Sequence, residues 1–187
     1  MKKLTKVLVA SLVCATLGVA EEYSYNSLIA VEGGASTFNV EKTDGSFDKD
    51  FTLSSVGLKV GAESENYRAF LGARYYMNST LDPMFTYGVE LQYLLNLGSA
   101  VNLFIGGGIG MAEIEMKDDG GQIRKTSDSY LSGDLGFNIH AGSNLDVELG
   151  ARIVNVDATN AQTTGGTYQY NNLITGYASL IYKFKMD

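Results

Sequence analysis

The sequence of 187 residues contains one proline, one cysteine, one histidine and no tryptophan. The cysteine, Cys14, lies in a segment expected to be removed, so no disulfide can hold the mature chain together. A single histidine and no mature cysteine also argue against a conventional zinc site. After Ala20 no stretch is apolar over the roughly 18 residues that a membrane-spanning helix needs. The abundant residues are instead glycine (22) and tyrosine (12), which favour many closely packed strands.

The first 20 residues have the form of a secretory signal peptide. Lys2, Lys3 and Lys6 precede an uncharged apolar run over residues 7–19, and Gly18 and Ala20 are small residues that signal peptidase accepts. We predict a signal peptide over residues 1–20 and one domain over residues 21–187. Without its three lysines the chain keeps 11 of 14 basic residues and all 21 acidic ones, a net charge of −10. This balance argues against nucleic acid as a partner.

The rest of the chain alternates apolar and polar residues with the period of a β-strand. The clearest segment is 67–77, in which one face carries Tyr67, Leu71 and Tyr75 and the other carries Arg68 and Arg74. Similar alternation predicts strands over residues 28–38, 52–63, 67–77, 85–94, 100–114, 129–140, 145–156 and 173–184. Connections are long after the first, fifth and seventh strands and short after the second, fourth and sixth.

A soluble sheet covers its apolar face with a second layer, and this chain has no segment left to supply one. A bilayer can take that place if the strands close into a barrel, and about 9–11 residues suffice to cross it at a tilt. Long loops on one side and tight turns on the other are also typical of such barrels. The predicted fold class is all-β, an eight-stranded antiparallel up-and-down transmembrane β-barrel.

The signal segment, the eight amphipathic strands and the terminal Tyr182-Lys183-Phe184 resemble the small eight-stranded outer-membrane barrels, of the OmpA transmembrane domain and OmpX type. The resemblance covers residues 21–184 and implies a place in the outer membrane of a Gram-negative bacterium, in contact with lipid and lipopolysaccharide. It further implies that Tyr182 and Phe184 form a C-terminal insertion signal for the outer-membrane insertion machinery. Ser179 departs from the glycine usual in that signal, and three residues follow Phe184.

The inner face of such a barrel would carry five basic and six acidic side chains. They are Glu32, Lys59, Glu63, Arg68, Arg74, Glu90, Asp134, Asp146, Glu148, Arg152 and Lys183. An eight-stranded barrel has room for little besides side chains, and buried charges are costly unless they are paired. We therefore expect a lumen closed by a salt-bridged polar core. The alternative is a porin-like path for small solutes or ions, gated by re-pairing of residues such as Arg74 and Glu90.

Outward aromatic residues are expected to form girdles at the two membrane interfaces. Tyr67, Tyr93, Tyr182 and Phe184 fall near the short turns, while Tyr75, Phe85 and Tyr87 fall toward the long loops.

The expected function is a structural or surface-interaction role, with a surface ligand meeting the loops over residues 115–127 and 157–172. No catalytic residue, cofactor or metal site is predicted. A lipid-modifying enzyme would need a histidine facing lipid at the outer leaflet, whereas His140 is inward-facing beside a short turn. A soluble lipocalin-like binder is a third alternative, and it would have apolar residues inside and charges outside.

Overall fold

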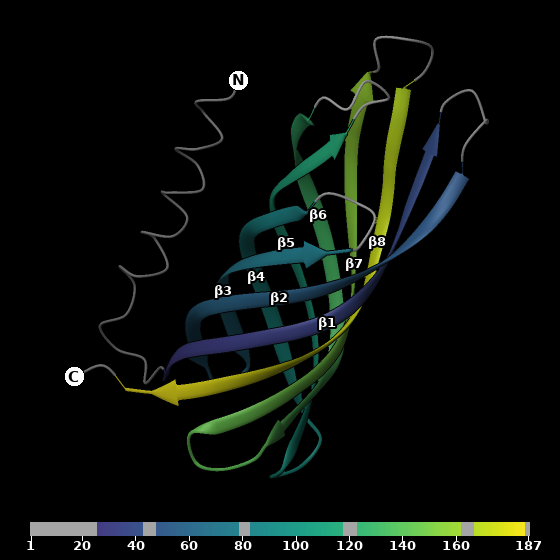
Figure 1. Cartoon of the computed structure of the whole chain (residues 1–187). Helices are drawn as coiled ribbons and strands as arrows, with labels where there is room; N and C mark the ends of the chain where they lie inside the picture. Colours follow the sequence, from purple (N-terminus) through teal and green to yellow (C-terminus); the bar gives the residue numbers. More distant parts are fainter. Residues whose placement is uncertain (1–25, 43–47, 79–82, 118–122, 162–166, 186–187) are drawn as a thin grey trace.

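The computed structural model describes residues 26–42, 48–78, 83–117, 123–161 and 167–185. Its eight strands are β1 (Asn26–Lys42), β2 (Asp48–Ser64), β3 (Tyr67–Met77), β4 (Met84–Asn96), β5 (Val101–Lys117), β6 (Ile123–His140), β7 (Leu145–Ala161) and β8 (Thr167–Phe184). Each strand pairs antiparallel with the next, and β8 pairs with β1 to close the barrel (Figure 1). This confirms the predicted fold class. The described residues include no helix that is long and apolar enough to cross a membrane.

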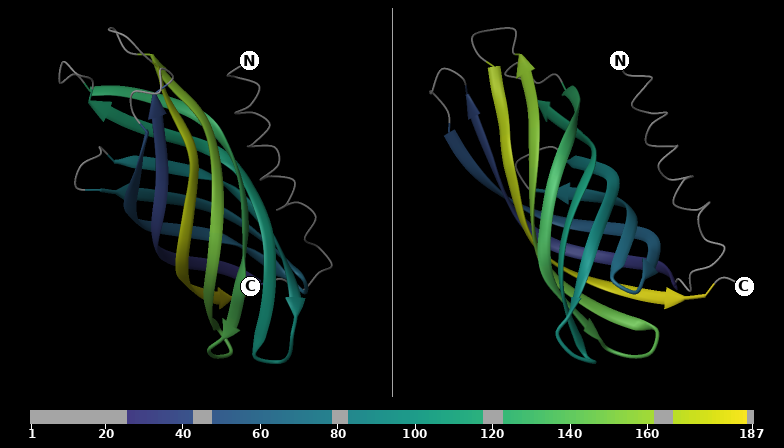
Figure 2. Two further views of the ribbon diagram at one scale, coloured as in Figure 1. Left: turned by 90° about the vertical axis from the view of Figure 1, so that its right-hand side faces the viewer. Right: turned by 180° about the vertical axis from the view of Figure 1, so that it is seen from behind.

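Most strands are longer than predicted, and most of the extra residues lie at the ends that carry the longer connections (Figure 2). Residues 115–117, 123–127, 157–161 and 167–172 belong to strands β5 to β8, so the prediction that 115–127 and 157–172 are loops is wrong for most of those residues. The pairing simply continues, for example between Glu115 and Lys125, whose exposed side chains form an ion pair. On β5 and β7 the alternation changes sense there, because the outward residues have become polar while inward residues such as Ile114 and Val156 are apolar.

The register fixes the tilt of the strands. A row of paired residues that starts at Val101 on β5 passes through β6, β7, β8, β1, β2, β3 and β4 and returns to β5 at Met111. The return is ten residues farther along the strand, which is the shear of this barrel. For eight strands such a shear corresponds to a tilt of about 40°. The tilt brings residues far apart in the sequence to one level of the lumen.

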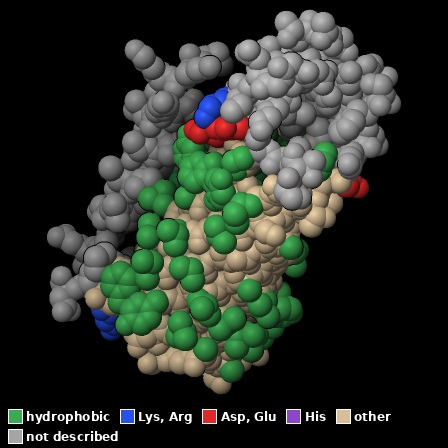
Figure 3. All heavy atoms as spheres, viewed as in Figure 1, with side chains coloured by type: hydrophobic (Ala, Val, Ile, Leu, Met, Phe, Trp, Pro, Cys, Tyr) green, Lys and Arg blue, Asp and Glu red, His purple; other side chains and the backbone are tan. Residues whose placement is uncertain are grey.

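The outer wall is apolar. Leu58, Leu131 and Leu135 are each at least 60% exposed, and such side chains cover the side of the barrel in Figure 3. The apolar belt ends on β7 and β8 just beyond the paired Ile153 and Ile174, where the side chains of Asn155 and Asn172 bond to each other at 3.0 Å. Charged residues face the interior, so the soluble lipocalin-like alternative, which needs the reverse arrangement, does not fit.

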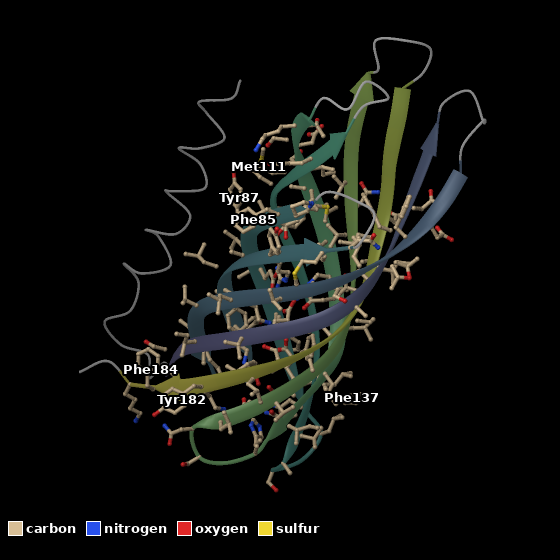
Figure 4. All side chains as sticks on the ribbon, in the orientation of Figure 1. Phe85, Tyr87, Met111, Phe137, Tyr182 and Phe184 are labelled. Carbon is tan, nitrogen blue, oxygen red and sulfur yellow. The ribbon has the colours of Figure 1, made fainter. Side chains whose placement is uncertain are left out.

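Aromatic side chains lie near both ends of this belt (Figure 4). Near the short turns the rings of Tyr67 and Tyr93 are 5.1 Å apart, and those of Tyr182 and Phe184 are stacked at 6.2 Å. Toward the other end Phe85 and Tyr87 are 5.9 Å apart. The placement suits rings with a polar edge at a membrane interface.

A charge placed in the middle of the belt should be costly. Leu135 lies midway along the part of β6 that carries lipid-facing residues, positions 131–139, and is 60% exposed. Leu135→Arg is expected to destabilise the barrel by about 2–4 kcal/mol in urea unfolding from phospholipid vesicles, since the arginine must enter hydrocarbon. Ser129→Arg, on the same face of β6 at the polar end, should cost less than about 1 kcal/mol. Equal costs would contradict the position of the belt.

Candidate functional site: the lumen

The structure brings all eleven of the predicted charged residues into the interior of the barrel. Nine of them are buried, while the side chains of Glu63 and Lys183 retain 12% exposure. They come from all strands except β5, which contributes inward glycines at Gly106, Gly108 and Gly110. Because glycine has no side chain, these positions on β5 leave room for the side chains of the neighbouring strands β4 and β6. A carboxylate oxygen of Asp134, for example, lies 2.6 Å from where a Cβ on Gly106 would be.

The charged side chains of the lumen form two clusters. The one nearer the long connections, which we call the Glu32 cluster, centres on the carboxylate of Glu32. Glu32 accepts hydrogen bonds from the Nε of Arg74 at 2.7 Å and from the Nη1 of Arg152 at 2.8 Å. The Nζ of Lys59 lies 3.3 Å from its other oxygen. Glu90 lies 2.5 Å from Arg74 and 3.6 Å from Arg152. Three cations thus share two carboxylates in a region that is closed to solvent.

Aromatic rings and a further carboxylate complete the surroundings of these cations. The Nζ of Lys59 donates to Glu148 at 3.0 Å and lies 4.9 Å from the centre of the Phe70 ring. The guanidinium of Arg152 stacks over Tyr177 at 4.3 Å. Such cation–π contacts are attractive where water is excluded. The cations are therefore held by contacts with aromatic rings as well as by ion pairs.

The lower cluster, which we call the Asp146 cluster, lies next to the short turns. Asp146 accepts hydrogen bonds from Arg68 at 2.6 Å and Asn138 at 2.9 Å, and the Nζ of Lys183 lies 3.0 Å away. His140 Nδ1 lies 2.9 Å from its other oxygen. Lys183 is on β8 and also lies 3.4 Å from Glu63 on β2, so this cluster ties the last strand across the closing seam.

Asp134 differs from the other lumen acids. It accepts hydrogen bonds from the Gln92 amide at 3.1 Å and the Tyr177 hydroxyl at 3.2 Å. Within the described ranges it makes no ion pair with lysine or arginine, although Arg152 is its register partner on β7. The Arg152 side chain instead reaches Glu32. Asp134 is held by neutral donors alone.

The polar core does not fill the whole lumen, which corrects the sequence-based expectation. Toward the loop end the interior contains a cluster of eleven buried, mostly apolar side chains, which we call the apolar plug. They are Phe38, Phe51, Leu53, Tyr76, Met84, Ala112, Ile114, Tyr130, Val154, Val156 and Leu173. The sequence did contain the signal, since these residues continue the inward-facing positions of their strands. The charged residues on the same faces predicted ion pairing alone, so this apolar part of the lumen was not predicted.

The arrangement offers little for catalysis. His140 is beside the short turn at Ala141 and points toward Asp146, on the opposite end of the barrel from the long connections and away from the lipid face. In the part of the chain that the structure describes, no group of three or more histidine, cysteine, aspartate or glutamate residues is arranged to hold a metal ion. The basic and acidic side chains of the lumen instead neutralise one another in ion pairs.

A closed barrel with a lipid-type outer belt, aromatic residues at both ends and a charge-filled interior defines an integral membrane β-barrel. The family model described as the outer membrane protein beta-barrel domain matches residues 7–184, and the chain belongs to this family. Membership implies location in the outer membrane of a Gram-negative bacterium. No curated protein sequence matched the chain.

Solved structures with the same fold have low sequence identity to this chain. Neisserial surface protein A aligns with a TM-score of 0.66 at 16% identity, covering 83% of this chain and 97% of that protein. Ail of Yersinia pestis, in complex with the heparin analogue sucrose octasulfate, gives 0.56 at 13% identity, with 84% and 99% covered. OprG of Pseudomonas aeruginosa gives 0.55 at 13% identity, with 86% and 97% covered.

Proposed function

We propose that this protein is a closed outer-membrane barrel with a structural or surface-interaction role and no transport activity of its own. The observation that carries this proposal is that side chains fill the interior of the barrel. The Glu32 and Asp146 clusters fill the middle and lower lumen with paired charges, and the apolar plug closes the part above them. An ion would have to break buried ion pairs and then cross an apolar region, and both steps are unfavourable.

The surface role is supported by the strand ends beyond the apolar belt. β5 to β8 continue past the belt as paired strands with polar outward residues, including Glu113, Lys125 and Asn155. A surface ligand would meet the segments 115–127 and 157–172, and lipopolysaccharide would surround the wall beneath them. Sucrose octasulfate binds to Ail, but the net charge of −10 here disfavours a polyanion.

Export and assembly form a second part of the proposal. A signal peptide over residues 1–20 would be cleaved before Glu21, which leaves the barrel domain over residues 21–187. The insertion machinery would recognise Tyr182 and Phe184 at the end of β8, where both rings are outward and stacked. Lys183 between them faces inward to Asp146 and Glu63, so the same three residues present a lipid-facing signal and close the lumen.

The rival function is an ion pore gated by Arg74. It draws support from the contacts of Arg74 with both Glu32 and Glu90, which provide two partners for a switch.

Conductance in planar bilayers separates the two functions. The wild type and Arg74→Ala are both expected to show no discrete openings, because the apolar plug stays closed when the ion pair is lost. The double variant Tyr76→Ala/Phe38→Ala removes two aromatic rings from the apolar plug, and its conductance is compared with that of Arg74→Ala. Discrete openings in the wild type would contradict the closed lumen, and openings that appear in Arg74→Ala alone would assign the gate to the ion pair.

A further inference from the structure

Beyond the apolar belt the wall of the barrel is no longer closed. On β6 the residues from Ile123 to Ser129 lie above the last pair with β7, which joins Tyr130 to Val156. On the other strand of this hairpin, β5 continues past its last pair with β4, at Ile114. Within the described residues these ends of β5 and β6 pair only with each other. The hairpin is therefore a two-stranded ribbon with a free edge on each strand.

A bulge turns β7 away from β6 at this level. Between the residues of β7 that pair with Asn172 and Tyr170 stand two residues, Val156 and Asp157, where β8 has only one. A bulge bends the strand that carries it and increases its twist. It begins at Val156, the residue at which the pairing of β6 with β7 ends. The bulge thus accounts for the separation of the two strands.

The backbone groups of the free edge of β6 point toward the side that β7 has left. The N–H of His140 donates to the oxygen of Ala100, so the even-numbered residues of β6 bond to β5. The register with β5 has no shift along β6. Neighbouring residues of an antiparallel strand direct their N–H and C=O groups to opposite sides. Lys125, Ser127 and Ser129 therefore direct theirs away from β5.

One of these groups already has a substitute partner. The N–H of Ser129 donates to the Asp128 carboxylate at 2.7 Å, and this side chain takes the place of a strand carbonyl. The N–H groups of Ser127 and Lys125 have no partner in the part of the chain that the structure describes. Both residues are exposed. Unpaired edge groups of this kind are a template for a further strand.

We propose that residues 123–129, the β6 edge, dock an extended segment of another protein, which adds as a strand on the side of β6 opposite β5. The inference rests on the proposed surface-interaction role and names the class of partner. In this mode of recognition main-chain hydrogen bonds provide affinity, and alternate side chains provide specificity. An antiparallel segment exchanges two hydrogen bonds with each of Lys125, Ser127 and Ser129. Its carbonyl replaces the Asp128 carboxylate at the N–H of Ser129.

A second copy of the barrel does not fit the β6 edge. Copies inserted in one membrane stand in the same orientation, so two β6 edges could meet only about an axis along the membrane normal. Each strand tilts by about 40° from that axis, and the two strands would cross at about 80°. Paired strands in a sheet are rotated by only about 20–25°. The partner is therefore a segment whose direction the membrane does not fix.

Hydrogen exchange of the barrel in nanodiscs tests the β6 edge. The probe is a peptide of alternating threonine and valine, as long as this edge and N-methylated along one side so that it can pair on the other side only. With the peptide present, the amide protons of Lys125 and Ser127 are expected to exchange at least about tenfold more slowly. Those of Thr126 and Asp128, which face β5, should not change. The same peptide methylated along both sides is the control and should give no protection.

Ser127→Pro blocks the β6 edge at its centre. Proline lacks the N–H, and edge strands tolerate it where that N–H would face solvent, so the barrel should fold. Binding of the fluorescent peptide, followed by anisotropy, is expected to weaken at least about tenfold in Ser127→Pro and to stay unchanged in Ser127→Ala. Heat-modifiable migration verifies that each variant is folded.

Several results would overturn the proposal. Absence of protection at millimolar peptide, or equal binding to wild type and Ser127→Pro, would show that the backbone of β6 is not the contact. Protection on β2 or β7 in place of β6 would refute this edge, and protection that rises with barrel density without peptide would assign it to a second copy. A surface ligand that bound wild type and Ser127→Pro alike would refute the edge and leave the surface role standing. Failure of the closed lumen is separate, since it shows as discrete openings in planar bilayers.

Discussion

Glu32→Ala is expected to destabilise the barrel by about 3–5 kcal/mol, because it leaves three buried cations short of a partner. Arg74 and Arg152 both donate to this carboxylate, and Lys59 lies 3.3 Å from it. Glu90 already contacts both arginines and cannot neutralise the whole set. Urea unfolding from phospholipid vesicles measures the loss, and heat-modifiable migration shows whether a folded barrel forms at all.

Asp134→Asn is the matched control for that experiment. Asp134 is as deeply buried as Glu32, at 4% against 5% exposure. Its donors are the neutral groups of Gln92 and Tyr177, and an asparagine carbonyl can accept from both, so the cost should be below about 1 kcal/mol. If the two substitutions cost the same, the ion pairs around Glu32 are not what stabilises the lumen.

Gly110→Val is expected to cost at least about 3 kcal/mol, because the new side chain has no space to enter. A Cβ at Gly110 would lie 2.2 Å from the backbone oxygen of Tyr87 and 2.6 Å from the ring of Tyr130. The ring could rotate away, but the oxygen belongs to the neighbouring strand, so β4 and β5 would have to separate. We expect little heat-resistant barrel at 37 °C and a lower urea midpoint for whatever folds.

Gly176→Val gives the comparison on the outer wall. Gly176 is exposed on β8, and a Cβ there would meet no atom within 4 Å. A β-branched residue also suits a strand, so this variant should fold as well as the wild type. If Gly176→Val lost as much stability as Gly110→Val, then crowding in the lumen would not be the cause of the loss.

The sequence was sufficient to predict the eight-stranded architecture, because the alternation of apolar and polar residues can be recognised within each strand separately. Segment 67–77 was bounded correctly as β3, and the inward and outward faces of the strands could be read directly from the period of two. Strand ends were less predictable. Where the wall rises above the lipid, the outward residues are polar, so the apolar outward face that marks a membrane strand ends before Glu115 and Lys125, although their strands are still paired.

Partners within the lumen could not be predicted, for a different reason. Which acid meets which base depends on the shear, and a shear of ten is a property of the closed barrel that no single strand records. Arg152 faces Asp134 in the register but reaches Glu32 on β1. The free edge of β6 is equally non-local, since it depends on where β7 bends away from its neighbour.

The two charged clusters of the lumen also determine at which stage of its assembly the barrel can become stable. Glu32 and Arg152 are 120 residues apart in the chain, Lys59 and Glu148 are 89 apart, and Arg68 and Asp146 are 78 apart. Until β7 has arrived, Lys59 lacks Glu148 and Arg68 lacks Asp146. Glu32 and Glu90 likewise lack Arg152. Contacts of such long separation make for slow, cooperative assembly. A nascent barrel that lacks its last hairpin is therefore expected to be unstable and to leave its strands open to periplasmic proteolysis.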